Sequence, residues 1–386
     1  MSALSPTDLR GEFLLDPEIA FLNHGSFGAS PRPVFERYQT WQLELEREPV
    51  DFLDRRLPAL LESARAALAE YVGCSSDDLV FVQNATTGVN LAARSLDLRP
   101  GDEVLATDLE YGACDLAWEW VCGRAGARYV RASLPLPLES PSTVVETLFA
   151  AATERTRIVY VSHVTSGTGL VLPVEEIVSR ARAQSLVTVV DGAHAPAQVP
   201  VDLTTLGADF YSGNCHKWLC NPRGAGFLYV RPEHQERVDG AIVSWGYAGG
   251  STFSERLEKQ GTRDPAAWLT VPAAIAYQGE RDWDDVRERC RRLARDARRE
   301  LCQLLGTEPL APDEMIAQMA AVRLPRPAPD LSRRLFARHR VEIPVGGTQK
   351  DLLRLSVAAY TTRVEIDRLL SALIRELDAE HGQHDE

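Results

Sequence analysis

The fold is decided by two stretches, VTVVDGAH at residues 187–194 and FYSGNCHKW at residues 210–218. Each begins with apolar or β-branched residues and ends in polar residues that can do chemistry. Short apolar runs of this kind are typical of strands that are covered on both faces of a parallel sheet. Ligands bind at the carboxyl ends of the strands in such sheets, so we expect Asp191, His194, His216 and Lys217 to lie at a common site.

Similar runs recur through the central part of the chain. We expect strands at residues 79–83, 103–106, 128–131, 157–162, 187–191, 210–213 and 226–230. Helical patterns lie between them, at residues 87–96, 114–124 and 174–184. This alternation predicts an α/β fold with a mostly parallel seven-stranded sheet and helices on both faces.

The C-terminal part of the chain follows a different pattern. Ile366, Leu370, Leu373 and Leu377 recur at the spacing of one helix face, and residues 320–324 and 352–357 have the pattern of strands. We therefore expect three parts. Residues 1–45 form an N-terminal arm and part of the small domain, residues 46–265 form a large ligand-binding domain, and residues 266–386 form a small α+β domain.

The composition excludes several classes of protein. The chain has 386 residues, 45% hydrophobic and 25% charged, and a net charge of −13. This acidic balance disfavours nucleic-acid binding. The sequence has neither an apolar run of membrane-spanning length nor a signal-peptide pattern, so we expect a cytoplasmic protein without a membrane partner. No CxxC pair occurs, and we expect neither a disulfide framework nor a metal site.

Lys217 carries the most distinctive chemistry. Beside Trp218 and the apolar run 187–190, its ammonium would lose hydration, which lowers the pKa. A neutral lysine amine can form a Schiff base with an aldehyde and later act as a base. Asp191 ends a buried strand, where an unpaired carboxylate is costly. A protonated pyridine nitrogen would satisfy it, as in pyridoxal phosphate enzymes. The alternative is a structural ion pair between Lys217 and Asp191.

Other candidate residues stand near strand ends. Thr86 and Thr87 open a helix, where N–H groups and hydroxyls can bind a phosphate; the alternative is that Thr86 only caps the helix. His194 and His216 can face a ligand or be ordinary core or surface histidines. Tyr111 can stack on a planar cofactor or simply pack.

Three further segments are candidates for ligand contacts. Residues 23–28 contain glycines that suit close approach of the backbone to a ligand. Arg354 lies inside an apolar strand pattern, where its partner can be a substrate carboxylate or a structural acidic residue. Residues 261–264 can form a second phosphate-contacting loop or only a turn.

Together these motifs resemble the class V aminotransferase family of pyridoxal phosphate enzymes, which have the aspartate aminotransferase type of fold (fold type I). The order and spacing of DGAH (191–194) and HKW (216–218) form the most specific element. The isopenicillin N epimerase-like branch is indicated by LNHGSFG (22–28), EPVDFL (48–53), SHV (162–164), GTRD (261–264) and RLS (354–356). The resemblance extends over residues 12–375, nearly the whole chain.

The resemblance implies that pyridoxal 5'-phosphate is the cofactor and that Lys217 binds it covalently. Asp191 would pair with the ring nitrogen, His194 would lie near the ring hydroxyl, and Tyr111 would stack on the ring. Ser166 would also contact the cofactor, although many relatives have Asn at this position.

The remaining implied contacts concern the phosphate and the substrate. The phosphate would contact Thr86, Thr87 and His216, together with Thr262 from the second subunit of a homodimer with shared active sites. Arg354 would bind the carboxylate of the substrate, with Asn23 and His24 in the same pocket.

Several reactions at the Cα of an amino acid are compatible with this family. Persulfide-forming cysteine desulfurisation needs a mobile cysteine late in the chain, and residues 303–386 contain none. We expect an epimerase or racemase acting on an amino acid or an amino-acid-derived small molecule, with Tyr247, Cys215 or His24 as the second acid or base. The alternatives are a C–S lyase that eliminates from a cysteine-derived substrate, an aminotransferase, and a catalytically silent binding protein.

Overall fold

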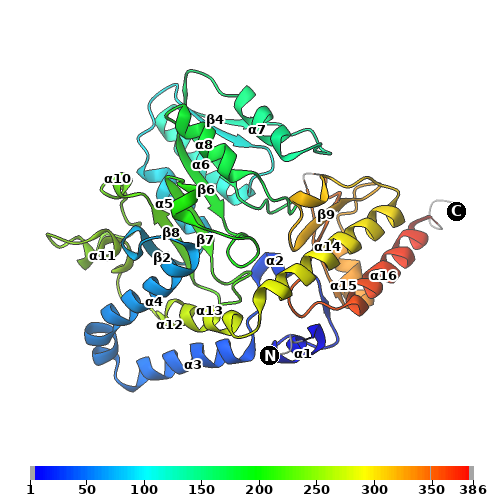
Figure 1. The fold of residues 1–386 in the computed structure, drawn as a ribbon, viewed down its shortest axis with the longest axis horizontal. Coiled ribbons are helices and arrows are strands. Elements are labelled where there is room, and N and C mark those ends of the chain that lie inside the picture. Colours follow the sequence, from blue (N-terminus) through cyan, green and yellow to red (C-terminus); the bar gives the residue numbers. More distant parts are fainter. Residues whose placement is uncertain (1–4, 348, 382–386) are drawn as a thin grey trace.

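The computed structural model describes residues 5–347 and 349–381. Figure 1 shows a larger part built around a central sheet and a smaller part that contains the C-terminal helices. The α-helices, in chain order, are α1 (Pro6–Glu12), α2 (His24–Phe27), α3 (Arg32–Arg47), α4 (Leu57–Val72), α5 (Ala85–Ser95), α6 (Gly112–Ala125), α7 (Pro141–Ala150), α8 (Val174–Ala183), α9 (Leu203–Leu206), α10 (Pro232–Gln235), α11 (Phe253–Glu258), α12 (Ala266–Leu269), α13 (Val271–Gly279), α14 (Trp283–Leu305), α15 (Leu331–His339) and α16 (Arg363–His381).

The central sheet has seven strands in the order β2-β8-β7-β6-β5-β3-β4. They are β2 (Leu79–Val82), β3 (Glu103–Thr107), β4 (Arg128–Ala132), β5 (Thr156–Ser162), β6 (Val187–Gly192), β7 (Phe210–Asn214) and β8 (Gly226–Val230). Strand β8 runs antiparallel to both of its neighbours, whereas the strand pairs from β7 to β4 are parallel. The predicted fold class and all seven predicted strands are thereby confirmed.

The sheet is covered on both faces, as the apolar runs predicted. Because successive side chains of a strand point to opposite faces, neighbouring residues join different core clusters. Val189 packs with Val89 of α5 and Trp118 of α6, whereas Val190 packs with Ile177 of α8. Asp191 continues this alternation and lies on the face of α5 and α6. The two-residue period of β6 therefore decides which neighbours surround its terminal carboxylate.

A second core lies in the smaller part of the molecule. It combines α14, α15 and α16 with a sheet of β11 (Val345–Gly346), β12 (Leu352–Ser356) and β9 (Met319–Arg323). The N-terminal segment belongs here too, because β1 (Ala20–Phe21) pairs with β10 (Val341–Glu342) and Leu9 of α1 is fully buried in this core. In Figure 1 the blue α1 accordingly lies beside the yellow-to-red elements.

Helices α12 and α13 pack within the core of the larger part, although the sequence assigned residues after 265 to the small domain. Trp268 stacks on Phe81 of β2 with ring centroids 5.4 Å apart. We therefore propose that the domain boundary lies after α13, near the start of α14. Among the described residues, no helix combines the length and the apolar character needed to cross a bilayer.

Candidate active site

A cavity of about 210 Å³ lies at the carboxyl ends of the central strands. Its wall includes seven of the predicted site residues: Thr86, Tyr111, Ser166, Asp191, His194, His216 and Lys217. They come from the C-terminal end of β6 and from the segments that follow β2, β3, β5, β6 and β7. The parallel sheet therefore brings together residues that are up to 131 positions apart in sequence, as the strand-end rule predicts.

The amine of Lys217 points at His194. Its Nζ atom lies 2.9 Å from Nε2 of His194. Burial is the main cause that lowers the pKa of Lys217, to about 8. Burial also holds the pKa of His194 well below its ordinary value, so this imidazole is neutral at pH 7. No described ion pair joins Lys217 to an acidic residue, which rules out the structural ion pair with Asp191 that the sequence left open.

Asp191 also lines the cavity, where its side chain is buried and has weak hydrogen-bond partners. One carboxylate oxygen accepts the N–H of Ala193 at 2.9 Å. The other lies 3.4 Å from the hydroxyl of Tyr160 and 3.6 Å from the thiol of Cys114. Burial raises the pKa of Asp191 above its usual range. A buried carboxylate without a cation is costly, and a protonated ring nitrogen would remove that cost.

The start of α5 forms the anion-binding end of the site. The side chain of Asn84, rather than that of Thr86, caps the helix by accepting the N–H of Thr87 at 2.9 Å. Asn214 of β7 accepts the N–H of Ala85 at 2.8 Å. Among the described residues, neither the hydroxyl nor the N–H of Thr86 has a partner. A helix N-terminus with free donors favours a phosphate.

The two asparagines that hold this helix start were missed in the sequence. Asn84 directly precedes the helix, and Asn is a common N-cap residue, so its bond to Thr87 could have been predicted from the sequence. The bond from Ala85 to Asn214 could not, because it depends on the pairing of distant strands. Thr87 does not line the cavity, and its hydroxyl lies 3.2 Å from Oδ1 of Asn84.

Arg354 lies directly behind the cavity wall. Its guanidinium donates to the carbonyl of Ser166 at 2.6 Å, to the hydroxyl of Ser26 at 2.9 Å and to Oδ1 of Asn23 at 3.2 Å. Its Nε atom is buried without a partner among the described residues. Burial lowers the pKa of Arg354 to about 10, and the side chain still carries its charge at pH 7. No described carboxylate pairs with it, so a carboxylate of the substrate remains a suitable partner.

His24 and Asn23 do not line the cavity. His24 is fully buried, with one ring nitrogen 2.9 Å from the carbonyl of Lys217 and the other 3.0 Å from the hydroxyl of Tyr360. Next to it, Gly28 has φ +69°, and a Cβ atom there would lie 1.8 Å from the carbonyl oxygen of His216. The close approach of Gly28 is therefore to the lysine loop of the same chain, whereas Ser26 and Phe27 of the same segment line the cavity.

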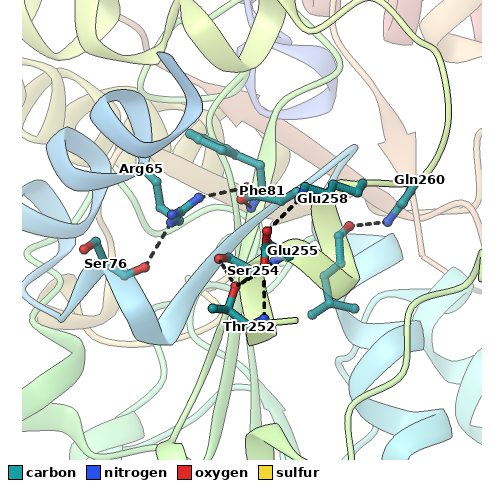
Figure 2. Close-up of polar contacts among 10 residues, drawn as sticks. Arg65, Ser76, Phe81, Thr252, Ser254, Glu255, Glu258 and Gln260 are labelled. Atoms are coloured by element: carbon teal, nitrogen blue, oxygen red, sulfur yellow. Dashed lines mark hydrogen bonds and ion pairs between the residues drawn. The ribbon is translucent and has the colours of Figure 1, made fainter. Parts of the chain in front are cut away.

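Thr262 lies on the surface, away from the cavity wall of its own chain. The segment before it is firmly held, as Figure 2 shows. The carboxylate of Glu258 accepts the N–H of Phe81 at 3.0 Å and pairs with Arg65 at 2.8 Å. Phe81 belongs to the edge strand β2, so Glu258 satisfies a main-chain donor that no strand reaches.

The remaining candidates for the second acid or base also lie outside the cavity. The thiol of Cys215 is fully buried, and the hydroxyl of Tyr247 accepts the N–H of Gly240 at 2.6 Å. Like His24, neither contributes to the cavity wall. Tyr111 does line the cavity; it is 44% exposed, and its hydroxyl has no hydrogen-bond partner among the described residues.

The cavity thus offers an amine with a lowered pKa for an aldehyde, a buried carboxylate for a basic ring nitrogen, and a helix start for a phosphate. Pyridoxal phosphate carries all three groups, and the protein is a pyridoxal phosphate-dependent enzyme. The chain belongs to the aminotransferase class-V family, whose model matches residues 32–369.

Comparison with known proteins gives more specific relatives. The chain is 40% identical over 385 residues to isopenicillin N epimerase of Streptomyces clavuligerus, with 95% of this chain and 97% of that protein covered. It is 29% identical over 408 residues to a probable chloroplastic L-cysteine desulfhydrase of Arabidopsis thaliana, with 96% and 86% covered. A solved structure of a C-DES mutant with glycine covalently linked to its PLP cofactor has a TM-score of 0.81 at 22% identity, with 94% and 98% covered. The predicted family, fold type and cofactor are confirmed.

Proposed function

We propose that this enzyme is an epimerase that inverts the Cα of an amino-acid-derived substrate, in line with its 40% identity to isopenicillin N epimerase over nearly the full length of both chains. The observation that carries the proposal is the amine of Lys217, which faces a cavity and has no acidic partner among the described residues. An amine in this state can bind the cofactor and later take a proton from Cα.

Each site residue has a proposed task. Bound pyridoxal phosphate withdraws electrons from the bond between Cα and its hydrogen, which acidifies that bond. Arg354 holds the substrate carboxylate with charge-assisted hydrogen bonds. Lys217 removes the Cα proton on its own side. Asp191 retains the proton on the ring nitrogen, because its buried carboxylate is best satisfied by a cation.

Epimerisation also needs a proton donor on the other side of Cα. We propose the hydroxyl of Tyr111, because this side chain lines the cavity, is 44% exposed and has no hydrogen-bond partner among the described residues. Replacement of Tyr111 by Phe keeps the ring and removes the proton. We expect this variant to exchange the Cα hydrogen with solvent while its rate of inversion falls at least tenfold.

Incubation in deuterated water tests the function itself. The probes are isopenicillin N and a panel of free L-amino acids. Deuterium at Cα together with a product of inverted configuration supports the epimerase. A wild-type enzyme that loads pyridoxal phosphate but never inverts any of these substrates contradicts it.

A C–S lyase is the second candidate, because the desulfhydrase of Arabidopsis thaliana aligns with 96% of this chain. The same Lys217 and Arg354 would serve, with loss of a thiol from Cβ after the Cα proton has left. Pyruvate and ammonia, released with hydrogen sulfide from L-cysteine or with cysteine persulfide from L-cystine, would identify this activity, and a keto acid that keeps the side chain would identify an aminotransferase.

We further propose that the enzyme works as a homodimer in which Thr262 reaches the phosphate of the other subunit. Thr262 is exposed. The bonds that Glu258 makes with Arg65 and with the N–H of Phe81 hold the segment just before Thr262 in place (Figure 2). Val243 and Trp245 of the same region are 76% and 85% exposed, and an apolar surface of this kind is typical of an interface. A hollow of about 1200 Å³ lies beside them.

Mixed dimers test this arrangement. One subunit carries Lys217→Ala and the other carries Thr262→Ala. If Thr262 acts across the interface, the site with an intact Lys217 receives an intact Thr262, and its cofactor affinity equals that of the wild type. If Thr262 acts within its own chain, that site shows the weakened affinity of the Thr262→Ala homodimer.

A further inference from the structure

Trp218 follows the cofactor-binding lysine and is almost completely buried. Its ring lies beside His24, with ring centroids 4.9 Å apart. Its indole N–H donates to Nδ1 of His194 at 3.4 Å. The other ring nitrogen of His194, Nε2, lies 2.9 Å from the amine of Lys217. One imidazole thus connects the indole of Trp218 to the amine that performs the chemistry.

The protons of this chain of contacts can be assigned. An indole nitrogen is only a donor, so Nδ1 of His194 must be the acceptor and carries no hydrogen. A neutral imidazole has one N–H group, which then stands on Nε2. This N–H points at Lys217 and needs an acceptor there. Only the neutral amine has a lone pair to offer, since an ammonium group is solely a donor.

We propose that the indole N–H of Trp218 fixes the tautomer of His194 and thereby favours the neutral form of the Lys217 amine, which binds the cofactor aldehyde and can accept a proton. Trp218 is in this account a positioning residue that acts through His194. The inference rests on the family's use of pyridoxal phosphate and is independent of whether the reaction is epimerisation or elimination.

Other groups near Lys217 raise or lower the pKa of its amine. Asp191 and Cys114 favour the ammonium, whereas Arg354 disfavours it. His216 stands beside Lys217 in the same loop, and His24 contacts its carbonyl. Burial lowers the pKa of both histidines to about 4, so they are neutral above pH 6. Burial is the largest influence on the pKa of Lys217, and His194 is the side chain whose ring nitrogen lies within hydrogen-bond distance of the amine.

Nitrogen NMR on the full-length enzyme reads the tautomer directly. With ¹⁵N-labelled histidine, His194 is assigned by the loss of its signals in His194→Gln. We expect a hydrogen on Nε2 in the wild type before loading with pyridoxal phosphate. A hydrogen on Nδ1 would overturn the proposal without any variant of Trp218.

The variant Trp218→Phe tests the consequence for Lys217. The chain contains only the lysines Lys217, Lys259 and Lys350, so selective labelling of lysine side chains gives a resolved titration of Lys217. We expect its pKa to rise by about one unit or more, which leaves roughly tenfold less neutral amine at pH 7. The rate of loading with pyridoxal phosphate at pH 7 should fall by the same factor and recover at pH 10.

Trp41→Phe is the matched control, because its buried indole N–H donates to the carbonyl of Leu269, outside the cavity wall. This variant should keep the wild-type titration and loading profile. If Trp218→Phe also keeps both, the proposal is wrong. Loading is measured without substrate, so a failure of the epimerase assignment leaves this result unaffected.

Discussion

Replacement of Asp191 by Asn separates the effect of its negative charge on the reaction rate from its effect on the stability of the fold. The amide is close in shape to the carboxylate, and its oxygen can still accept the N–H of Ala193, which lies 2.9 Å from Oδ1. The amide NH₂ can donate toward Tyr160 or Cys114. The variant therefore keeps the local structure and removes only the negative charge.

The loss of charge should reduce the reaction rate strongly. Removal of one partner of a buried ion pair costs about 3–5 kcal/mol, and this cost would apply to a protonated ring nitrogen paired with Asp191 in the arrangement proposed above. Each 1.36 kcal/mol is a factor of ten in rate. We expect the exchange of the Cα hydrogen with deuterium to slow by roughly 10²- to 10⁴-fold, while the cofactor stays linked to Lys217.

The cofactor-free protein should respond in the opposite direction. Burial raises the pKa of Asp191. The ionised carboxylate therefore destabilises the fold at pH values above the ordinary carboxyl range, and this destabilisation disappears as the pH falls. Asp191→Asn should unfold at a temperature equal to or above that of the wild type when both lack cofactor at pH 7.5. Proton NMR of Cα exchange and thermal unfolding measure the two effects. Exchange within tenfold of wild type, or a large loss of thermal stability, would refute the reasoning.

The remaining predictions concern the binding of the phosphate, the binding of the substrate and the buried carboxyl group of Glu258. Thr86→Val should weaken pyridoxal phosphate binding about tenfold, as the loss of one hydrogen bond to a charged group predicts, whereas Thr87→Val, whose hydroxyl already bonds Asn84, should change it less than threefold in a fluorescence titration. Arg354→Lys loses the paired guanidinium donors, so kcat/KM should fall about 100-fold with an unchanged cofactor absorption spectrum; an unchanged kcat/KM would exclude Arg354 from substrate binding. Burial outweighs the attraction of Arg65 and raises the pKa of Glu258 from 4.5 to about 7. The stability from this raised pKa is present below pH 4.5 and lost as the pH rises to 7, so the unfolding free energy of the wild type relative to Glu258→Gln should fall by up to about 3 kcal/mol between pH 4.5 and 7.5; parallel pH curves would contradict this.

The central sheet could be predicted from the sequence because its strands are buried on both faces. The run Val187–Val190 has no polar residue other than Thr188, and such a near-continuous apolar run is typical of a parallel strand covered on both faces. The clustering of Thr86, Asp191 and Lys217 then followed from the topology of a parallel sheet. We propose a boundary after α13 instead of near residue 265. The sequence could not indicate this, because α12 and α13 are short and apolar, and only packing such as that of Trp268 on Phe81 shows which core they join.

Side-chain directions were beyond the reach of the sequence. His24 stood in a motif that suggested a substrate contact, yet its ring faces Tyr360 and the carbonyl of Lys217. No spacing rule indicated that Trp218, the residue after the lysine, would turn back to His194. Contacts of this kind depend on the rotamers of residues from different elements, and local sequence carries no signal for them.

Reduction of the loaded enzyme with borohydride, followed by peptide mass spectrometry, tests the central claim most directly. The reduced cofactor becomes a stable label on the lysine that bound it. Because Lys217, Lys259 and Lys350 are the only lysines, the assignment is unambiguous. The account predicts one pyridoxyl group per chain, on the peptide that contains Lys217. A label on Lys259 or Lys350 alone, or no label on a protein that binds pyridoxal phosphate, would contradict it.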